Sequence, residues 1–148
     1  MATAMDDIHL IQQFPGVDDY CRLRTLAGMS PRTREAAQRG LPNTLYGVSL
    51  LRDGEVVGMG RIIGDGGCFY TVADIAVAPA YQGKGQGRRI MDALDAWLRR
   101  NAQASAVVSL VADGDAKHLY AKYGFVESAP AAVNMEYIAP LPQWDGNA

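Results

Sequence analysis

Residues 82–87 read Gln-Gly-Lys-Gly-Gln-Gly, and they lie between a short apolar run at 75–79 and a strongly periodic helical segment that begins near Arg88. Glycine gives a turn conformations that other residues rarely adopt and lets the backbone approach a ligand closely. The first N–H groups of a helix have no partner inside the helix, and they favour an anion. The turn is therefore predicted to bind phosphate, with a flexible loop as the alternative that the turn alone leaves open.

Two other phosphate-binding motifs are excluded by their spacing. The turn does not end in Gly-Lys-Ser/Thr, and Gly87 is followed three positions later by Ile90, where a dinucleotide fingerprint needs glycine. Lys84 and Arg88 add positive charge at the turn, although the chain has 14 basic and 16 acidic residues. The attraction for an anionic ligand is thus expected to be local.

The composition predicts one globular domain over residues 1–148, in which residues 139–148 form a loosely held tail. With 49% hydrophobic residues, a chain of this length can bury a core without disulfides or a structural metal. Cys21 and Cys68 form no Cys-x-x-Cys pair, and His9 and His118 are the only histidines, so no metal site is expected.

Charge and hydropathy also limit the expected binding partners and the expected cellular location of the chain. The net charge is −2 and no basic stripe is present, which argues against nucleic-acid binding. Residues 1–7 do not read as a secretory leader, and no apolar run reaches the roughly 18 residues of a membrane span. A cytoplasmic protein that does not bind membranes is the expectation.

Periodicity and turn signals predict four helices and six or seven strands. Ser30 and Pro31 are expected to begin the second helix, and Asp53-Gly54 predicts a hairpin. The predicted strands are 8–13, 44–51, 55–63, 68–78, 106–111, 125–127 and 133–138, and the predicted helices are 17–27, 32–39, the segment from about 88, and 115–123. This order indicates an α/β (α+β) fold in which the strands ending at Ala78 and Val111 are parallel neighbours, with the glycine turn at their open end.

Two motifs in this order resemble the GNAT superfamily of acetyl-CoA-dependent N-acetyltransferases. The signature Gln/Arg-x-x-Gly-x-Gly/Ala is matched by Gln82, Gly85 and Gly87, and a helix with Leu-Tyr that ends in Gly-Phe is matched by Leu119, Tyr120, Gly124 and Phe125. The resemblance covers about residues 72–126. It implies a mixed sheet that is splayed at its centre and flanked by helices. Many members of the superfamily are dimers, so a homodimer is a further alternative.

The resemblance also implies how acetyl-CoA binds. Main-chain N–H groups of the glycine turn would hold the pyrophosphate, and the backbone of the strand before the turn would pair with the pantetheine arm. Asp113 stands where relatives often have asparagine, which adds a negative charge. The implied cofactor-binding residues are Ile75, Ala76, Val77, Gln82, Gly83, Lys84, Gly85, Gln86, Gly87, Arg88, Asp113 and Tyr123.

Two residues are candidates for catalysis by direct attack of an amine on the thioester. Tyr120 falls on the motif position for a hydrogen bond or proton to the sulfur of CoA, and its alternative role is packing on the inner face of a helix. Asp74 is the candidate for helping to deprotonate or orient the amine, or it pairs only locally. A carboxyl of pKa about 3.9 is a weak base unless burial or a water relay assists it. Neither cysteine lies in a nucleophile motif.

The acceptor site is expected around the first two helices and their loop, at Arg22, Met29, Ser30 and Arg32, with Arg24 close in sequence. These arginines suit a carboxylate or phosphate on the substrate, although a charged run on a short helix is more often a solvated face. The leading hypothesis is an N-acetyltransferase acting on a primary amine of a small molecule. A local similarity of residues 73–77 and 81–83 to glucosamine-phosphate N-acetyltransferases makes an amino sugar one candidate. The alternatives are a protein or peptide acetyltransferase and a non-catalytic acyl-CoA-binding module.

Overall fold

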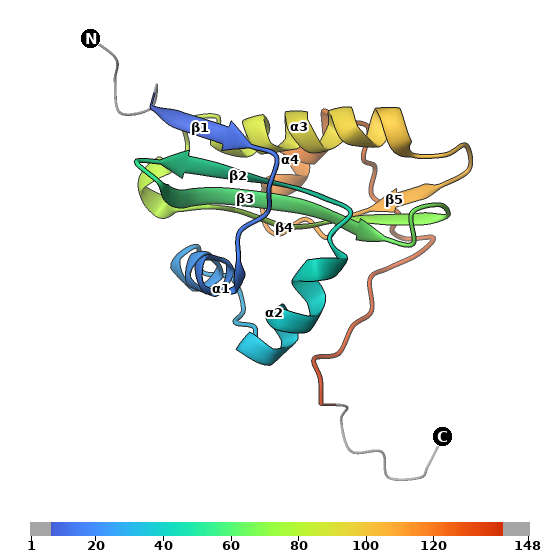
Figure 1. The fold of residues 1–148 in the computed structure, drawn as a ribbon. Helices are drawn as coiled ribbons and strands as arrows, with labels where there is room; N and C mark the ends of the chain where they lie inside the picture. Colours follow the sequence, from blue (N-terminus) through green and yellow to red (C-terminus); the bar gives the residue numbers. More distant parts are fainter. Residues whose placement is uncertain (1–6, 141–148) are drawn as a thin grey trace. The chain divides into compact units, whose positions relative to one another are not determined.

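The computed structural model describes residues 7–140 and contains one five-stranded sheet in the order β1-β2-β3-β4-β5 (Figure 1). The first four strands pair antiparallel. β4 and β5 pair in parallel, as the sequence predicts for the strands ending at Ala78 and Val111. The strands are β1 Ile8–Ile11, β2 Tyr46–Arg52, β3 Glu55–Gly64, β4 Phe69–Val77 and β5 Val107–Ser109.

All four predicted helices are present: α1 Val17–Leu26, α2 Arg34–Gly40, α3 Gln86–Asn101 and α4 Ala116–Ala121, with short 3-10 turns at Leu41–Asn43 and Pro79–Tyr81. The expected start of α2 at Ser30 and Pro31 is wrong. Thr33 is the N-cap, because its hydroxyl oxygen accepts the Ala36 N–H at 3.1 Å from an extended backbone. No helix within residues 7–140 is long and apolar enough to cross a membrane.

The chain forms two compact units, Met1–Leu110 and Val111–Ala148. The first contains the sheet and α1 to α3, and the second contains α4. The expectation of a single domain over residues 1–148 stays a prediction.

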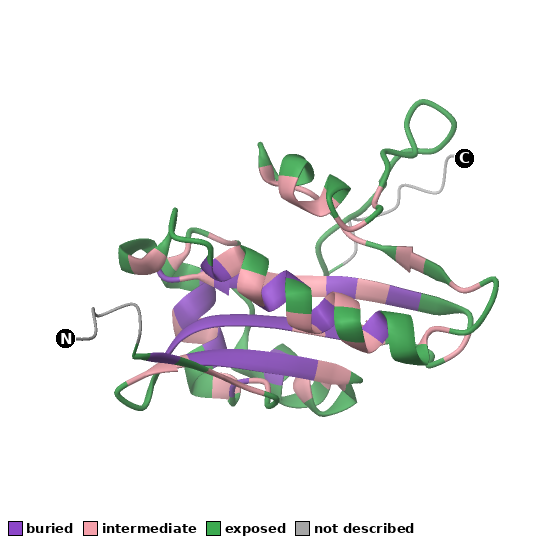
Figure 2. Ribbon diagram, turned by 90° about the horizontal axis from the view of Figure 1, so that it is seen from above, coloured by how far each residue is buried: buried purple, intermediate pink, exposed green. Residues whose placement is uncertain are grey.

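In the first unit, α3 covers one face of the sheet, and α1 and α2 lie on the other (Figure 1). The apolar stripe predicted for α3 is the buried one, and Figure 2 shows buried and exposed residues alternating along this helix. The side chains that fill the core between α3 and the sheet are fully or almost fully buried: Val48, Leu50, Ile62, Tyr70, Val72, Ile90, Leu94 and Leu98. A large part of the core of this unit therefore lies between α3 and the sheet.

The two strands predicted at 125–127 and 133–138 are wrong, which leaves five strands where six or seven were expected. Val126 and Met135 are 89% and 88% exposed, and among residues 7–140 the side-chain hydrogen bonds in this part of the chain are local, from Ser128 to Ala132 and from Asn134 to Glu136. Alternating apolar residues make a strand only where another strand supplies the hydrogen bonds. Most of the predicted tail, residues 141–148, lies outside the described residues.

Gly60 permits the close approach of α3 to β3. A Cβ built on Gly60 would lie 2.5 Å from Cγ2 of Ile90 and 3.3 Å from Cδ1 of Leu94, and both of these side chains are fully buried. We expect Gly60→Ala to lower the free energy of unfolding by about 1–3 kcal/mol, measured by urea denaturation, because the packed neighbours cannot move away.

Gly40→Ala is the matched control, since a Cβ on this last residue of α2 would meet nothing within 4 Å. We expect it to change the free energy of unfolding by no more than about 0.5 kcal/mol. Similar losses in both variants would contradict the tight packing of α3 on β3.

Candidate functional site

A β-bulge interrupts the pairing of β3 with β4. Met59 pairs with Ala76 and Arg61 pairs with Ala73, so Asp74 and Ile75 together face the single residue Gly60. Asp74 has a φ of +58°, which is uncommon for a residue with a side chain. The extra residue re-aims the side chains around it, as bulges do.

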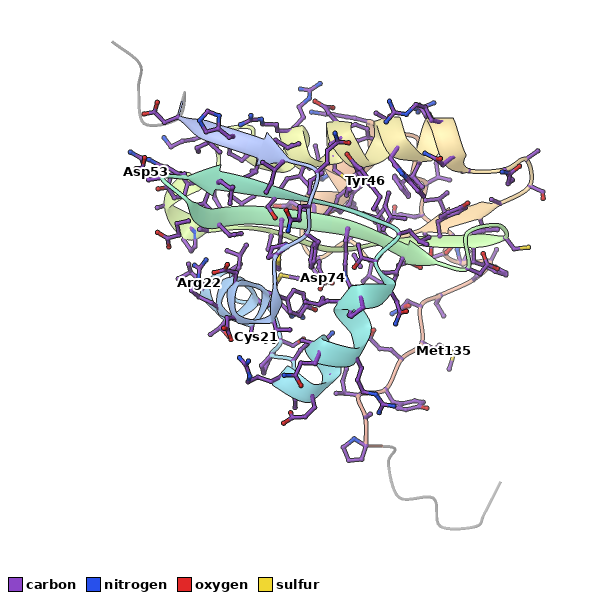
Figure 3. The ribbon with its side chains drawn as sticks, in the orientation of Figure 1. Cys21, Arg22, Tyr46, Asp53, Asp74 and Met135 are labelled. Atoms are coloured by element: carbon purple, nitrogen blue, oxygen red, sulfur yellow. The ribbon has the colours of Figure 1, made fainter. Side chains whose placement is uncertain are left out.

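The bulge sends Asp74 and the following residue to opposite faces of the sheet. Cγ1 of Ile75 lies 3.4 Å from the Cβ position of Gly60, on the face that α3 covers. Asp74 lies on the face that α1 and α2 cover, as Figure 3 shows.

The Asp74 carboxylate is bound by three donors from α1 and β3. Its Oδ1 accepts from Nη1 of Arg24 at 2.6 Å and from the hydroxyl of Tyr20 at 3.0 Å, and its Oδ2 accepts from Nε of Arg61 at 2.7 Å. The Asp74 side chain is 8% exposed and that of Arg24 5%. Both oxygens of this carboxylate are thus occupied by charge-assisted or hydroxyl hydrogen bonds.

Asp74, Tyr20, Arg24 and Arg61 are called the Asp74 cluster below. Its two arginines are fixed by further contacts. Arg24 donates from Nε to the carbonyl oxygen of Ser30 at 2.9 Å and from Nη2 to the Ser30 hydroxyl at 3.2 Å. Arg61 donates from Nη1 to the Thr44 hydroxyl at 3.0 Å. Burial raises the pKa of the Tyr20 hydroxyl, and the negative charge of Asp74 raises it further, so Tyr20 stays protonated as a donor.

One edge of β4 is open beyond its start. β4 pairs with β5 only through residues 69–71, whereas it stays paired with β3 as far as Val77. The Ala78 N–H donates to the carbonyl of Val57 at 2.8 Å. Because backbone groups of successive residues point to alternate edges, Ile75 and Val77 turn theirs away from β3. Within residues 7–140 no strand occupies that edge, so an extended ligand can pair there.

The glycine turn follows β4 directly and opens α3. Gly83 and Gly85 have φ of +75° and +82°, and Gly85 is the N-cap of the helix. The main-chain N–H groups of residues 83–87 donate to no acceptor among the described residues, and the first helical bond runs from the Arg89 N–H to the Gly85 carbonyl at 3.1 Å. A Cβ on either glycine would meet nothing within 4 Å, so open space lies beside these donors. This is the geometry of an anion-binding turn.

Two glutamine side chains lie at this turn. Gln82 donates from Nε2 to the Val77 carbonyl at 2.8 Å, which ties the turn to the end of β4. Gln86 is 7% exposed, and its Oε1 is the one fully buried side-chain polar atom without a hydrogen-bond partner within residues 7–140. A buried acceptor of this kind fits a ligand or water that brings a donor.

The second unit holds three of the predicted residues, Asp113, Tyr120 and Tyr123. Tyr120 lies on α4, is half-buried, and packs edge-on against Phe125 with ring centroids 6.5 Å apart. Burial raises the pKa of its hydroxyl, and the negative charge of Asp113 raises it further. The Asp113 carbonyl accepts the Ala116 N–H at 3.1 Å at the start of α4. Tyr120 is therefore held as a neutral phenol that can donate.

The residues predicted for the acceptor site separate in the structure. Ser30 binds Arg24, and Arg32 donates from Nη1 to the Ser30 hydroxyl at 3.0 Å, so both connect with the Asp74 cluster. Arg22 instead pairs with Asp19 and Glu55 and donates to the Val56 carbonyl. Met29 contributes a main-chain N–H to the carbonyl of Arg24.

Three residues bind Asp74, and sequence reasoning named only Arg24 among them, as a possible substrate contact and not as a partner of Asp74; it did not select Tyr20 or Arg61. A signal was nevertheless present, because Arg61 and Asp74 are single opposite charges inside two apolar segments that are consecutive strands in the predicted order. A lone charge in a buried strand needs a partner, and the adjacent strand offers it.

Comparison with known proteins identifies the family. The model of the acetyltransferase (GNAT) domain matches residues 46–127. The chain is 43% identical to a probable acetyltransferase of unknown function from methicillin-resistant Staphylococcus aureus, with a TM-score of 0.85 over 88% of this chain and 98% of that one. The chain belongs to the GNAT superfamily and is an acyltransferase.

Other solved structures share the fold. A GNAT-family acetyltransferase from Streptococcus pneumoniae is 25% identical, with a TM-score of 0.71 over 90% of this chain and 99% of that one. The ribosomal-protein-S18-alanine N-acetyltransferase from Escherichia coli is 21% identical, with a TM-score of 0.65 over 81% and 79% of the two chains. The comparison with curated proteins gave no match.

We expect Asp74→Asn to lower the free energy of unfolding by about 3–5 kcal/mol, because it leaves two buried guanidinium groups without their counter-charge. Urea denaturation measures the loss. Asp95→Asn is the control, since Asp95 binds Arg99 at 2.8 Å and the Arg99 side chain is 68% exposed. That variant is expected to lose less than about 1 kcal/mol. Equal losses would show that the Asp74 cluster is no more than a surface ion pair in energy.

Proposed function

We propose that this acetyltransferase moves the acetyl group of acetyl-CoA to a primary amine of a small molecule, by direct attack with both substrates bound. The observation that carries the proposal is the row of N–H groups at residues 83–87, which have no acceptor among residues 7–140, with open space beside Gly83 and Gly85 at the start of α3. Such donors attract the pyrophosphate of CoA locally. The net charge of the chain is −2 and would not attract an anion by itself.

The residues at the turn and along β4 fit this donor substrate. Residues 83–88 would bind the pyrophosphate, with Lys84 adding charge, and the open edge at Ile75 and Val77 would pair with the amides of the pantetheine arm. Ala76 and Gln82 hold that edge and the turn in place, since Ala76 pairs with Met59 and Gln82 binds Val77. We retain Asp113 and Tyr123 of the second unit as proposed cofactor contacts. When bound, acetyl-CoA supplies the thioester carbonyl and the leaving thiolate.

Tyr120 is the proposed donor to the departing sulfur. Its raised pKa keeps the hydroxyl protonated throughout the neutral range, which a hydrogen-bond donor requires. A thiolate has a pKa of about 8.5, so a hydrogen bond from Tyr120 stabilises it without a full transfer of the proton.

For Asp74, we propose that it orients the acceptor side of the site. Its two oxygens already accept hydrogen bonds from two guanidinium groups and a phenol, so the carboxylate is engaged in holding these three side chains. Asp74 is thus proposed as a positioning residue that acts through Arg24 and Arg61. Ser30 and Arg32, which connect with Arg24, are proposed to contact the acceptor as well. Arg22 and Met29 are proposed as acceptor contacts further from Asp74.

A small acceptor is favoured because the polar groups on the α1 and α2 face converge on one carboxylate. Recognition of an extended peptide would use a row of groups along a strand edge or groove. The relatives of this fold include an enzyme named for a protein substrate, so a protein amine is the second candidate. The non-catalytic acyl-CoA-binding module is the third, and it predicts binding without turnover.

We expect Gly85→Ala to weaken acetyl-CoA binding about tenfold or more, because the new methyl group enters the space beside the free N–H groups. The readout is the rise in melting temperature with added acetyl-CoA, which reports affinity for the folded state. Gly66→Ala is the control, since Gly66 has nearly the same φ of +80° and lies in the β3–β4 turn. Both variants share the cost of backbone strain, so an equal response to acetyl-CoA would refute the assignment of the turn.

We expect Tyr120→Phe to lower kcat about tenfold to a hundredfold, the value of one hydrogen bond to a charged group, while acetyl-CoA still raises the melting temperature. Turnover is measured as thiol release from acetyl-CoA over a panel of amine classes. Tyr137→Phe is the control, because Tyr137 is 61% exposed in the same unit. Unchanged turnover would remove Tyr120 from the mechanism, and binding without release for every amine would favour the non-catalytic module.

A further inference from the structure

The Asp74 cluster carries unbalanced charge. It contains two guanidinium groups and one carboxylate, and the side chains of Arg24, Arg61 and Asp74 are only 5%, 11% and 8% exposed. Within residues 7–140, Asp74 is the only carboxylate that forms an ion pair with either arginine. A net positive charge so far removed from water is costly, and an anion placed beside it would be bound strongly.

Arg61 also has a hydrogen-bond donor that the protein does not use. All three nitrogens of the Arg24 guanidinium donate within the cluster. For Arg61, Nε binds Asp74 and Nη1 binds Thr44, but Nη2 donates to no described residue. The only fully buried polar side-chain atom without a partner in this part of the chain is Oε1 of Gln86, so Nη2 of Arg61 is not fully buried.

Two aromatic rings pack against the guanidinium group of Arg61, which is called the fork below. Its guanidinium lies 5.4 Å from the ring centre of Phe14 and 6.0 Å from that of Tyr20. Phe14 can pack here because Gly47 has no side chain, since a Cβ on Gly47 would lie 2.7 Å from Cβ of Phe14. A guanidinium held by two hydrogen bonds and two neighbouring aromatic rings loses little freedom when it binds an anion.

The position of the fork on the sheet relates it to the proposed chemistry. Arg61 pairs across the sheet with Ala73, next to the bulge at Asp74. Val77, at the open edge of β4, is three residues further along, roughly 10 Å at about 3.3 Å per residue. An anionic group on Arg61 and the amine of the same acceptor would therefore lie within roughly 10 Å of each other.

We infer that the acceptor amine carries an anionic group, a carboxylate or a phosphate, and that Nη2 of Arg61 binds it. Arg24 and Asp74 are the positioning residues that hold Arg61. The inference rests on the proposed function, because it names the class of acceptor that the same site takes.

The first test compares acceptor pairs with the wild-type protein and uses no variant. β-Alanine is compared with β-alanine amide, and phosphoethanolamine with ethanolamine, by thiol release at saturating acetyl-CoA. We expect kcat/KM to be at least about tenfold higher for the anionic member of a pair, the value of one hydrogen bond to a charged group. The pair that shows the difference tells a carboxylate from a phosphate.

The second test uses Arg61→Lys, which keeps the charge but cannot bind Asp74, Thr44 and a ligand together. We expect KM for the anionic acceptor to rise about tenfold or more, and KM for its neutral partner to stay within about twofold. Arg99→Lys, at an exposed pair on α3, is the control and should change neither value. Retained stabilisation by acetyl-CoA shows that Arg61→Lys is folded.

The possible outcomes distinguish a failure of the proposed function from a failure of the inference about the acceptor. If no amine of any class is acetylated although acetyl-CoA binds, the proposed function fails. If amines are acetylated but the neutral members of both pairs react as well as the anionic ones, the inference is overturned and the proposed function stands. An equal rise in KM for both members in Arg61→Lys would also overturn it, because it would leave Arg61 with a structural role only.

Discussion

The ion pairing of Asp74 with Arg24 and Arg61 is the constraint on which the rest of the first unit depends. One carboxylate joins α1, β3 and β4, and it can do so only because the bulge turns Asp74 away from the α3 face. The same bulge brings Ile75 to that face and sets which edge the backbone of Val77 presents. The glycine turn then begins at the end of the strand that this pairing has fixed. A structural ion cluster and the proposed cofactor edge are thus two results of one inserted residue.

Positive potential in this acidic chain is concentrated rather than spread. At the glycine turn it comes from main-chain N–H groups and the start of α3, and at the Asp74 cluster from a guanidinium group in excess. The first source cannot titrate, and arginine stays charged at any physiological pH, so both persist where the net charge is −2. Low exposure strengthens such fields, because less water screens them. An acceptor with its own negative charge would meet a favourable potential without any general attraction to polyanions.

Periodicity and turn chemistry predicted the helices and the β2–β3 hairpin, because these depend on residues close in sequence. The glycine turn was found for the same reason. The parallel pairing of β4 with β5 was inferred from the order strand, helix, strand. The strands at 125–127 and 133–138 could not be judged in this way, since pairing is decided by distant partners. The contacts of Arg61 with Asp74 depend on a shift of register, which no local pattern reveals. The glycine turn proposed for the donor substrate was thus readable from sequence, whereas the contacts around Asp74 required the fold.

The short pairing of β4 with β5 also bears on how the protein behaves without its ligand. A strand edge that offers free backbone groups is where chains self-associate, and natural sheets protect such edges. Here β5 covers only residues 69–71, and the amide of Gln82 caps the Val77 carbonyl at the far end. Between them, residues 72–76 of β4 are covered neither by β5 nor by the Gln82 side chain. An extended ligand bound at this edge would therefore block its pairing with another chain. The ligand-free protein would be the form most prone to aggregate.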